Sequence, residues 1–176
     1  NALPTQATDD YTARQYYQQV NQIECTRNTH RTFSTPHDDT DVVFGLLTGY
    51  PCCTTNMHQA WPKFTQNLWY ATDDDGLAAL VFAPCSVTAT VADGVKVEIK
   101  EDTFYPFDET VKMTVNFPDK KVKSAYFPLK LRIPGWCETP VVTVNGEPVE
   151  MTMTAGTVVS LRRTWNKGDV VSVELP

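Results

Sequence analysis

The sequence predicts a mainly β protein in which residues 76–176 form an antiparallel β-sandwich of jelly-roll-like form. Val and Thr together account for 44 of the 176 residues, and 17 of the 20 Val residues follow Gly76. β-branched side chains favour strands. In the same region short runs of alternating apolar and polar residues are separated by turn residues. About eight strands at this spacing are typical of two packed antiparallel sheets.

The expected strands follow one another along this second part. Residues 77–83 are nearly all apolar, which predicts a buried strand. Asp93-Gly94 predicts a hairpin turn between strands at 87–91 and 95–100, and Asn145-Gly146 predicts another. In the strand at 95–100 the apolar residues all face one way. The remaining strands are expected at 111–115, 129–133, 142–144, 148–151, 158–162 and 170–175.

Residues 1–75 have a different character. Apolar side chains recur every three or four positions within residues 54–70, which predicts an amphipathic helix. Pro62 is expected to kink that helix or to open a second helix in its first turn. Residues 15–23 are compatible with a strand, and residues 27–41 with a long polar loop. One helix and a long loop do not make a self-sufficient domain, so we interpret residues 1–75 as the tail of a helical domain, with a boundary at Asp75-Gly76.

Charge and hydropathy exclude two classes of partner. The chain has 21 acidic and 15 basic residues, a formal net charge of −6, and no basic cluster. We therefore expect no nucleic-acid partner. The longest apolar run, residues 77–84, is far shorter than the roughly 18–20 residues of a membrane span, so no membrane partner is expected. The chain starts Asn1-Ala2-Leu3 without Met or a signal peptide, and we expect it to be part of a longer protein.

The adjacent cysteines Cys52 and Cys53 are the sharpest candidate site. They precede the predicted helix, and Thr54 or Thr55 is available as its N-cap. A helix N-terminus stabilises a thiolate, which is both a nucleophile and a zinc ligand. Adjacent cysteines do not form an ordinary disulfide with each other without strain. The alternative is that both are small buried apolar residues.

Other possible metal ligands precede this pair. They are Glu24, Cys25, His30, His37, Asp38, Asp39 and Asp41. Their spacing fits no standard zinc finger, and a solvated polar loop is the simpler explanation of these residues. Cys85 and Cys137, near the ends of predicted strands, are interpreted as packing residues. Five cysteines without regular spacing argue against a disulfide framework.

Glycoside hydrolysis would require two carboxyl groups at a defined separation across a cleft. The candidates by residue type are Asp73, Asp74, Asp75, Glu98, Glu101, Asp108 and Glu109. Each is also explained as part of a turn or as the solvent face of a strand. Aromatic residues that could stack on sugar rings are Tyr16, Tyr17, Tyr50, Trp61, Trp69, Tyr70, Phe104, Tyr105 and Phe107. Core packing is the alternative for most of them.

Several segments resemble glycoside hydrolase family 127, the β-L-arabinofuranosidase-like proteins common in gut Bacteroides. Those similar to the end of its catalytic domain are Tyr50-Pro51-Cys52-Cys53-Thr54-Thr55-Asn56, Trp61-Pro62-Lys63-Phe64 and Gln66-Asn67-Leu68-Trp69-Tyr70. Those similar to its β-sandwich, in the same order, are Tyr105-Pro106-Phe107-Asp108, Leu131-Arg132-Ile133-Pro134-Gly135-Trp136, Val144-Asn145-Gly146-Glu147 and Trp165-Asn166-Lys167-Gly168-Asp169. The resemblance covers nearly the whole chain.

The resemblance implies that residues 1–75 are the end of an (α/α)6 barrel and residues 76–176 the sandwich behind it. In the family a glutamate and three cysteines hold zinc, and the first cysteine of the adjacent pair is the nucleophile. By this match Cys52 is the nucleophile and a zinc ligand, and Cys53 is a zinc ligand. Zinc keeps a thiolate deprotonated and in place, as a retaining glycosidase nucleophile requires.

The chain also departs from the family. The Glu-x-Cys ligands and the acid/base glutamate of the family lie upstream of this sequence, and Glu24-Cys25 does not replace them. Thr54 stands where members usually have Pro. The intact parent is therefore expected to be a retaining, exo-acting hydrolase of L-arabinofuranosyl side chains of plant polysaccharides, whereas this fragment alone is expected to be inactive and without bound zinc. The resemblance also implies a periplasmic or secreted location in a Gram-negative bacterium.

Two alternatives to the hydrolase remain open at this point. One is a non-catalytic carbohydrate-binding or structural β-sandwich module, in which exposed aromatic residues contact sugar. The other is a redox or zinc-storage role for Cys52 and Cys53.

Overall fold

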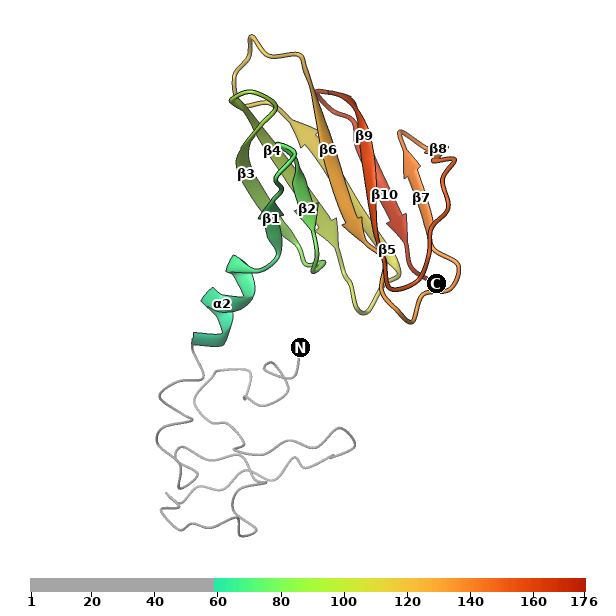
Figure 1. Cartoon of the computed structure of the whole chain (residues 1–176). Coiled ribbons are helices and arrows are strands. Elements are labelled where there is room, and N and C mark those ends of the chain that lie inside the picture. Colours follow the sequence, from blue (N-terminus) through green and yellow to red (C-terminus); the bar gives the residue numbers. More distant parts are fainter. Residues whose placement is uncertain (1–58) are drawn as a thin grey trace, which may run out of the picture. The chain divides into compact units, whose positions relative to one another are not determined.

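The computed structural model describes residues 59–176 (Figure 1). The chain divides into two compact units, Asn1–Lys63 and Phe64–Pro176. The predicted barrel tail therefore lies almost wholly outside the described residues, together with the predicted strand at 15–23 and the loop at 27–41. The domain boundary at Gly76 stays a prediction.

The described residues are mainly β, as the sequence predicts. One short helix precedes ten strands. The elements are α2 (Ala60–Gln66), β1 (Trp69–Ala71), β2 (Leu77–Ala79), β3 (Cys85–Val91), β4 (Val95–Thr103), β5 (Thr110–Asn116), β6 (Ser124–Arg132), β7 (Val141–Val144), β8 (Glu147–Pro148), β9 (Val158–Asn166) and β10 (Val170–Glu174). No helix among residues 59–176 is long and apolar enough to cross a membrane.

The strands form two sheets (Figure 1). One has four strands in the order β1-β2-β6-β9, and the other has six in the order β3-β4-β5-β10-β7-β8. All pairs are antiparallel except β2 with β6, where Leu77 pairs with Leu129. Because β3, β4 and β5 lie in the other sheet, the chain leaves the four-stranded sheet after β2 and returns to it at β6. The predicted antiparallel sandwich is confirmed, with this one parallel pair as an addition.

Buried residues of both sheets form one hydrophobic cluster. Its largest member is Trp165 on β9, which is fully buried and donates its indole N–H to the carbonyl oxygen of Phe127 at 2.9 Å. The rings of these two residues lie 6.0 Å apart. A buried indole needs such a partner for its N–H, so this bond places Trp165 specifically against β6.

The two predicted hairpin turns are confirmed. Asp93 and Gly94 have φ angles of 57° and 100°, and Asn145 and Gly146 have 54° and 85°. Positive φ at two successive residues is characteristic of the tight turn that matches the twist of antiparallel strands. Val91 therefore pairs directly with Val95 across the first hairpin.

The predicted helix at 54–70 is wrong at its C-terminal end, because α2 ends at Gln66. The amide N–H of Asn67 bonds to the carbonyl of Phe64, a three-residue step that closes the last turn. Trp69 then pairs with Ala79 on β2. Sheet pairing thus overrides the helical spacing of the apolar residues at this end. Pro62 lies in the first turn of α2, a position where proline is tolerated.

The strand predicted at 77–83 is shorter than expected. β2 ends at Ala79, and the amide N–H of Leu80 already bonds back to the carbonyl of Leu68 at 3.2 Å. The chain then passes through Phe82, which is buried, and reaches the other sheet at Cys85. The apolar residues after Ala79 are therefore part of the crossing between the two sheets.

Candidate functional site

The residues predicted to carry catalysis and to bind zinc, Cys52 and Cys53, lie outside the described residues. The earlier candidate ligands between Glu24 and Asp41 also lie outside them. Within residues 59–176 no group of three or more His, Cys, Asp or Glu side chains is placed to hold a metal ion.

A buried carboxylate, Glu101 on β4, is the most unusual polar group of the described residues. Its side chain is 1% exposed. It accepts hydrogen bonds from the indole N–H of Trp69 and the amide N–H of Ala83, each at 3.0 Å. The thiol of Cys85 is a third donor, with its sulfur 3.7 Å from the carboxylate. Glu101 therefore joins β1, β3 and the segment between the two sheets.

The interpretation of Glu101 as a solvent-facing or turn residue is wrong. Val97 and Ile99 are fully buried, and Glu101 is the next residue on that face of β4. The alternation of the strand thus carries the carboxylate into the core. Its three donors compensate for the loss of water around it.

Burial dominates the electrostatics of this cluster. It raises the pKa of Glu101 from 4.5 to about 7, although the bonds from Ala83, Trp69 and Cys85 act in the opposite direction. Burial, followed by the charge of Glu101, raises the pKa of the Cys85 thiol from 9.0 to about 11. Cys85 is therefore a protonated thiol near neutral pH and offers no thiolate to a metal or an electrophile.

The other described cysteine, Cys137, is fully buried in the hydrophobic cluster. It follows the exposed residue Trp136 at the turn after β6. Its packing role is as the sequence predicts, and Cys85 combines partial burial with the bond to Glu101.

The remaining candidate carboxylates occupy turns or outer strand faces, as expected. Glu98 accepts hydrogen bonds from Ser86 and Asn116 on neighbouring strands of the same sheet. Asp108 accepts the amide N–H of Thr110 at 3.0 Å. Glu109 is exposed. These three carboxylates thus make strand or turn contacts or face solvent.

Asp74, in the turn between β1 and β2, makes more hydrogen bonds and ion pairs than these three carboxylates. Its carboxylate accepts a hydrogen bond from Thr72 at 2.5 Å and forms ion pairs with Lys130 at 3.0 Å and Arg162 at 2.6 Å. The bonds from Thr72 and Lys130 are the main causes that lower its pKa to about 2. Asp74 is therefore ionised at any physiological pH and fixes two basic side chains.

The aromatic residues divide into two groups. Phe104 and Phe107, on the segment between β4 and β5, are 78% and 95% exposed, whereas Tyr105 is partly buried and packs edge-on against Phe82. Tyr126, which no sequence pattern singles out, is 58% exposed. Of the other predicted aromatic residues that the structure describes, Trp61 and Tyr70 are exposed and Trp69 is half-buried.

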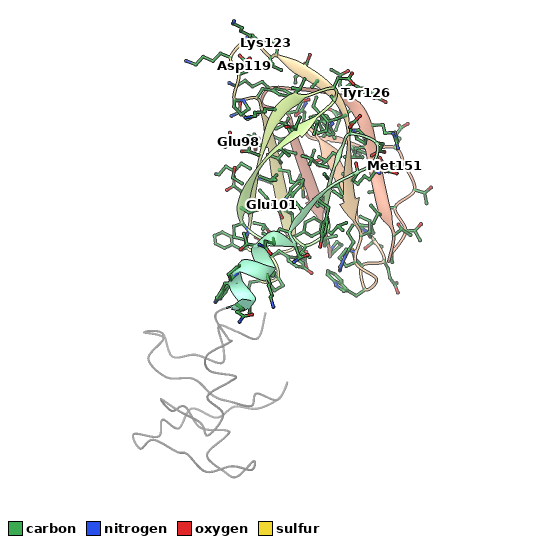
Figure 2. All side chains as sticks on the ribbon, turned by 60° about the vertical axis from the view of Figure 1, so that its left-hand side comes forward. Glu98, Glu101, Asp119, Lys123, Tyr126 and Met151 are labelled. Atoms are coloured by element: carbon green, nitrogen blue, oxygen red, sulfur yellow. The ribbon has the colours of Figure 1, made fainter. Side chains whose placement is uncertain are left out.

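The position of Tyr126 on β6 follows from strand alternation, because its neighbours Ala125 and Phe127 are both buried. Tyr126 lines an open depression of about 420 Å³, together with Arg162 and the turn that carries Asp74. In Figure 2 Tyr126 lies in the upper part of the sandwich and Glu101 lies lower down, and Glu101 does not line the depression. The buried carboxylate cluster and this depression are thus two separate features of the described unit.

Comparison with known protein families accounts for this sandwich. Residues 76–176 match the family described as the GH127 middle domain of beta-L-arabinofuranosidase. The chain belongs to this family. The GH127 match covers more than half of the 176 residues and runs from the start of β2 to the end of the chain. The resemblance found in the sequence is thereby confirmed.

Solved structures agree with the GH127 assignment. The GH127 β-L-arabinofuranosidase of Geobacillus stearothermophilus T6 is similar to 71% of this chain, with 32% identity and a TM-score of 0.63. A GH127 β-arabinofuranosidase is similar to 73% of it, with 25% identity and a TM-score of 0.62. A structure described as a glycoside hydrolase matches with a coverage of 100% of this chain, 24% identity and a TM-score of 0.74.

The GH127 chain spans only 19%, 22% and 27% of the length of these three structures, respectively. A search of curated proteins found no match. Comparison therefore assigns the family and the sandwich, and the activity of the whole protein is a matter for proposal.

Proposed function

We propose that this chain belongs to a retaining glycoside hydrolase that releases L-arabinofuranosyl units from plant polysaccharide side chains. The observation that carries the proposal is the match of residues 76–176 to the GH127 middle domain. The segment from Tyr50 to Asn56, with its two adjacent cysteines, supports it from the sequence. We therefore expect catalysis to depend on residues outside residues 59–176, where the adjacent cysteines lie.

In the proposed mechanism Cys52 is the nucleophile. Its thiolate attacks the anomeric carbon, the glycosidic bond breaks, and a general acid donates a proton to the departing oxygen. Water then attacks the anomeric carbon, the conjugate base of the general acid takes a proton from that water, and the carbon–sulfur bond breaks to release the Cys52 thiolate. Two inversions at the same carbon retain the anomeric configuration. The general acid is expected in the part of the protein that precedes this sequence.

Cys52 and Cys53 are also the proposed zinc ligands. Two soft thiolates suit zinc, but they supply only half of a four-ligand site, and we expect the other ligands upstream of Asn1. Bound zinc would keep the Cys52 sulfur deprotonated and oriented. Neither described cysteine is a substitute, since Cys137 is enclosed in the core and Cys85 is held as a protonated thiol by burial and Glu101.

In this proposal the sandwich is a structural support for the segment that follows the cysteine pair. Trp69 belongs to the segment that follows the cysteine pair, and its indole N–H is bonded to buried Glu101. Leu68, next to it, is buried and accepts amide bonds from Leu80 and Val81. The end of that segment is therefore fixed to the sandwich by specific bonds, which we infer is the structural role of residues 64–176 in the parent.

Substitution of Cys52 tests the mechanism in the full encoded protein. We expect Cys52→Ala to lower hydrolysis of a 4-nitrophenyl β-L-arabinofuranoside by about 10³-fold or more, because no other group replaces the nucleophile. Circular dichroism should show an unchanged fold. The matched control is Cys85→Ala, which removes a protonated thiol and should retain most activity. An active Cys52→Ala protein would disprove the nucleophile assignment.

The zinc content of the protein and the activity of residues 1–176 alone provide an independent test of the proposal. We expect elemental analysis to find one zinc per full protein, strongly reduced zinc in Cys53→Ala, and neither zinc nor hydrolysis in residues 1–176 alone. Stoichiometric zinc in the fragment would instead favour the zinc-storage role. The periplasmic or secreted location stays a prediction that fractionation of the source cells can test.

A further inference from the structure

Four segments that are distant in the sequence meet at the Tyr126 depression. Tyr126 comes from β6 and Arg162 from β9. Asp74 and Asp75 come from the turn between β1 and β2, and Asp93 from the turn between β3 and β4. Figure 2 shows Tyr126 in the upper part of the sandwich. All five residues belong to the unit Phe64–Pro176.

Close backbone contacts hold these segments together. A Cβ added to Gly76 would lie 2.2 Å from the carbonyl oxygen of Pro128, so only glycine allows the β1–β2 turn to lie this close to β6. The amide N–H of Ala92 donates to the carbonyl oxygen of Asp75 at 3.1 Å. The two turns that carry the three acidic residues are thus held in place by backbone contacts.

The cation of the depression is held in a defined orientation. Arg162 uses Nη2 to bond Asp74 at 2.6 Å, and its side chain is still 53% exposed. Lys130 and Thr72 occupy the other oxygen of Asp74. Because a guanidinium group has five N–H donors in a fixed plane, Arg162 retains donors for a ligand while Asp74 sets its direction.

Other groups in the depression have polar atoms that are free to bind. The hydroxyl of Tyr126 and the carboxylates of Asp75 and Asp93 form no hydrogen bond or ion pair with the described residues. Tyr126 is 58% exposed, and Asp93 is also exposed. The depression therefore offers one exposed aromatic ring, one oriented donor and two acceptor groups.

We propose that the Tyr126 depression is a binding subsite for a neutral saccharide. A sugar ring presents a face of C–H groups, which suits stacking on Tyr126, and it is edged by hydroxyl pairs, which suit Arg162 and the two free carboxylates. The volume of about 420 Å³ lies within the range of small-molecule sites and has room for one or two sugar residues. The choice of sugar as the ligand rests on the proposed function.

Charge favours a neutral ligand over an acidic one. Three carboxylates, Asp74, Asp75 and Asp93, line the depression with one cation, Arg162. Asp74 is already paired with Arg162 and with Lys130. An anionic sugar would therefore meet two unpaired negative charges. A neutral sugar would instead donate hydroxyl hydrogens to the same two groups.

Binding can be measured on residues 1–176 without any hydrolysis. We would titrate the ¹⁵N-labelled chain with linear L-arabinofuranosyl oligosaccharides and separately with galacturonic acid. We expect saturable shifts at the amides of Tyr126, Arg162 and Asp93 with the neutral oligosaccharides, and much smaller shifts with the acid. Absence of saturable shifts there with the neutral oligosaccharides would overturn the proposal.

Two aromatic variants separate the subsite from general surface stickiness. Tyr126→Ala should weaken binding about tenfold, since loss of a stacking contact costs roughly a factor of ten. The matched control is Trp136→Ala, because Trp136 is 56% exposed but does not line the depression. Unchanged affinity in Tyr126→Ala, or equal loss in both variants, would contradict the proposal.

The experiments distinguish failure of the subsite proposal from failure of the proposed function. If Cys52→Ala abolishes hydrolysis but the titration shows nothing, the catalytic proposal stands and the subsite fails. If binding depends on Tyr126 but the full protein has no arabinofuranosidase activity, the subsite stands and the chain is a carbohydrate-binding module. Failure of both would leave the sandwich with a structural role.

Discussion

At the scale of single residues, Glu101 is the clearest case in which the environment changes the chemistry of a side chain. The same residue type three positions earlier, Glu98, lies on the opposite, outer face of β4 and makes ordinary surface hydrogen bonds. Glu101 is enclosed, and burial raises its pKa to about 7. Its protonation near neutral pH therefore affects the stability of the sandwich.

Glu101 predicts a specific pH dependence of stability. Because its pKa in the folded state is raised from 4.5 to about 7, the folded protein holds this proton more tightly than the unfolded protein. The resulting stabilisation is present below about pH 4.5 and is lost as the pH rises through 7. We expect this group to lower the free energy of unfolding by roughly 2–3 kcal/mol across that window.

Urea unfolding of Glu101→Gln at pH 5, 6, 7 and 8 tests this expectation. In this variant the free energy of unfolding should depend much less on pH. The amide group also places a donor against the indole N–H of Trp69, so the variant should be less stable at every pH. Glu98→Gln is the matched control and should keep the slope of the original protein. An unaltered slope in Glu101→Gln would mean that another group causes it.

At the scale of elements, the β1–β2 turn depends on a close approach between Gly76 and Pro128. Gly76 is buried, and its Cα has no room for a side chain toward β6. β2 and β6 form the one parallel pair of the described sheets, with Leu77 opposite Leu129 directly after this contact. The glycine therefore sets how closely the turn with its aspartates lies against β6.

Gly76→Ala should destabilise the sandwich by about 2–4 kcal/mol, because the backbone of one segment must move to relieve the overlap. Chemical denaturation measures the loss. Gly135→Ala is the control, since its added Cβ would have its nearest neighbour at 4.0 Å. Its free energy of unfolding should change by less than about 0.5 kcal/mol. Equal stability of the two variants would contradict the close approach.

At the scale of the whole molecule, residues 64–176 form a compact unit with one hydrophobic cluster drawn from both sheets. Such a unit has the size of an ordinary domain and its own core. We expect a polypeptide of residues 64–176 to fold by itself and to unfold in a single cooperative transition. Scanning calorimetry checks this, and a broad transition without a heat-absorption peak would refute it.

The sequence predicted the sandwich because strand alternation and turn residues are local signals. Hairpin turns at Asp93-Gly94 and Asn145-Gly146 were found because positive φ restricts the residue types. The burial of Glu101 was missed for the opposite reason. Residue type indicated solvent, whereas the alternation after Val97 and Ile99 already pointed into the core.

Two further features could not be predicted from short-range sequence patterns. The end of α2 at Gln66 depends on the pairing of Trp69 with Ala79, ten positions further along the chain. Tyr126 was not among the predicted sugar contacts, because its exposure alone is unremarkable for a strand residue. Tyr126 becomes a candidate sugar contact only because the folded chain brings Arg162 and Asp74 into the same depression.

The sequence by itself determined the class of the fold and, through its specific segments, the GH127 family of this protein. Periodicity and turn chemistry act between near neighbours, so they can be read without coordinates. Only the tertiary structure decided that Glu101 is enclosed by three donors and that Tyr126, Arg162 and the aspartates share one depression. Those features depend on contacts between distant segments, which the packing of the two sheets creates.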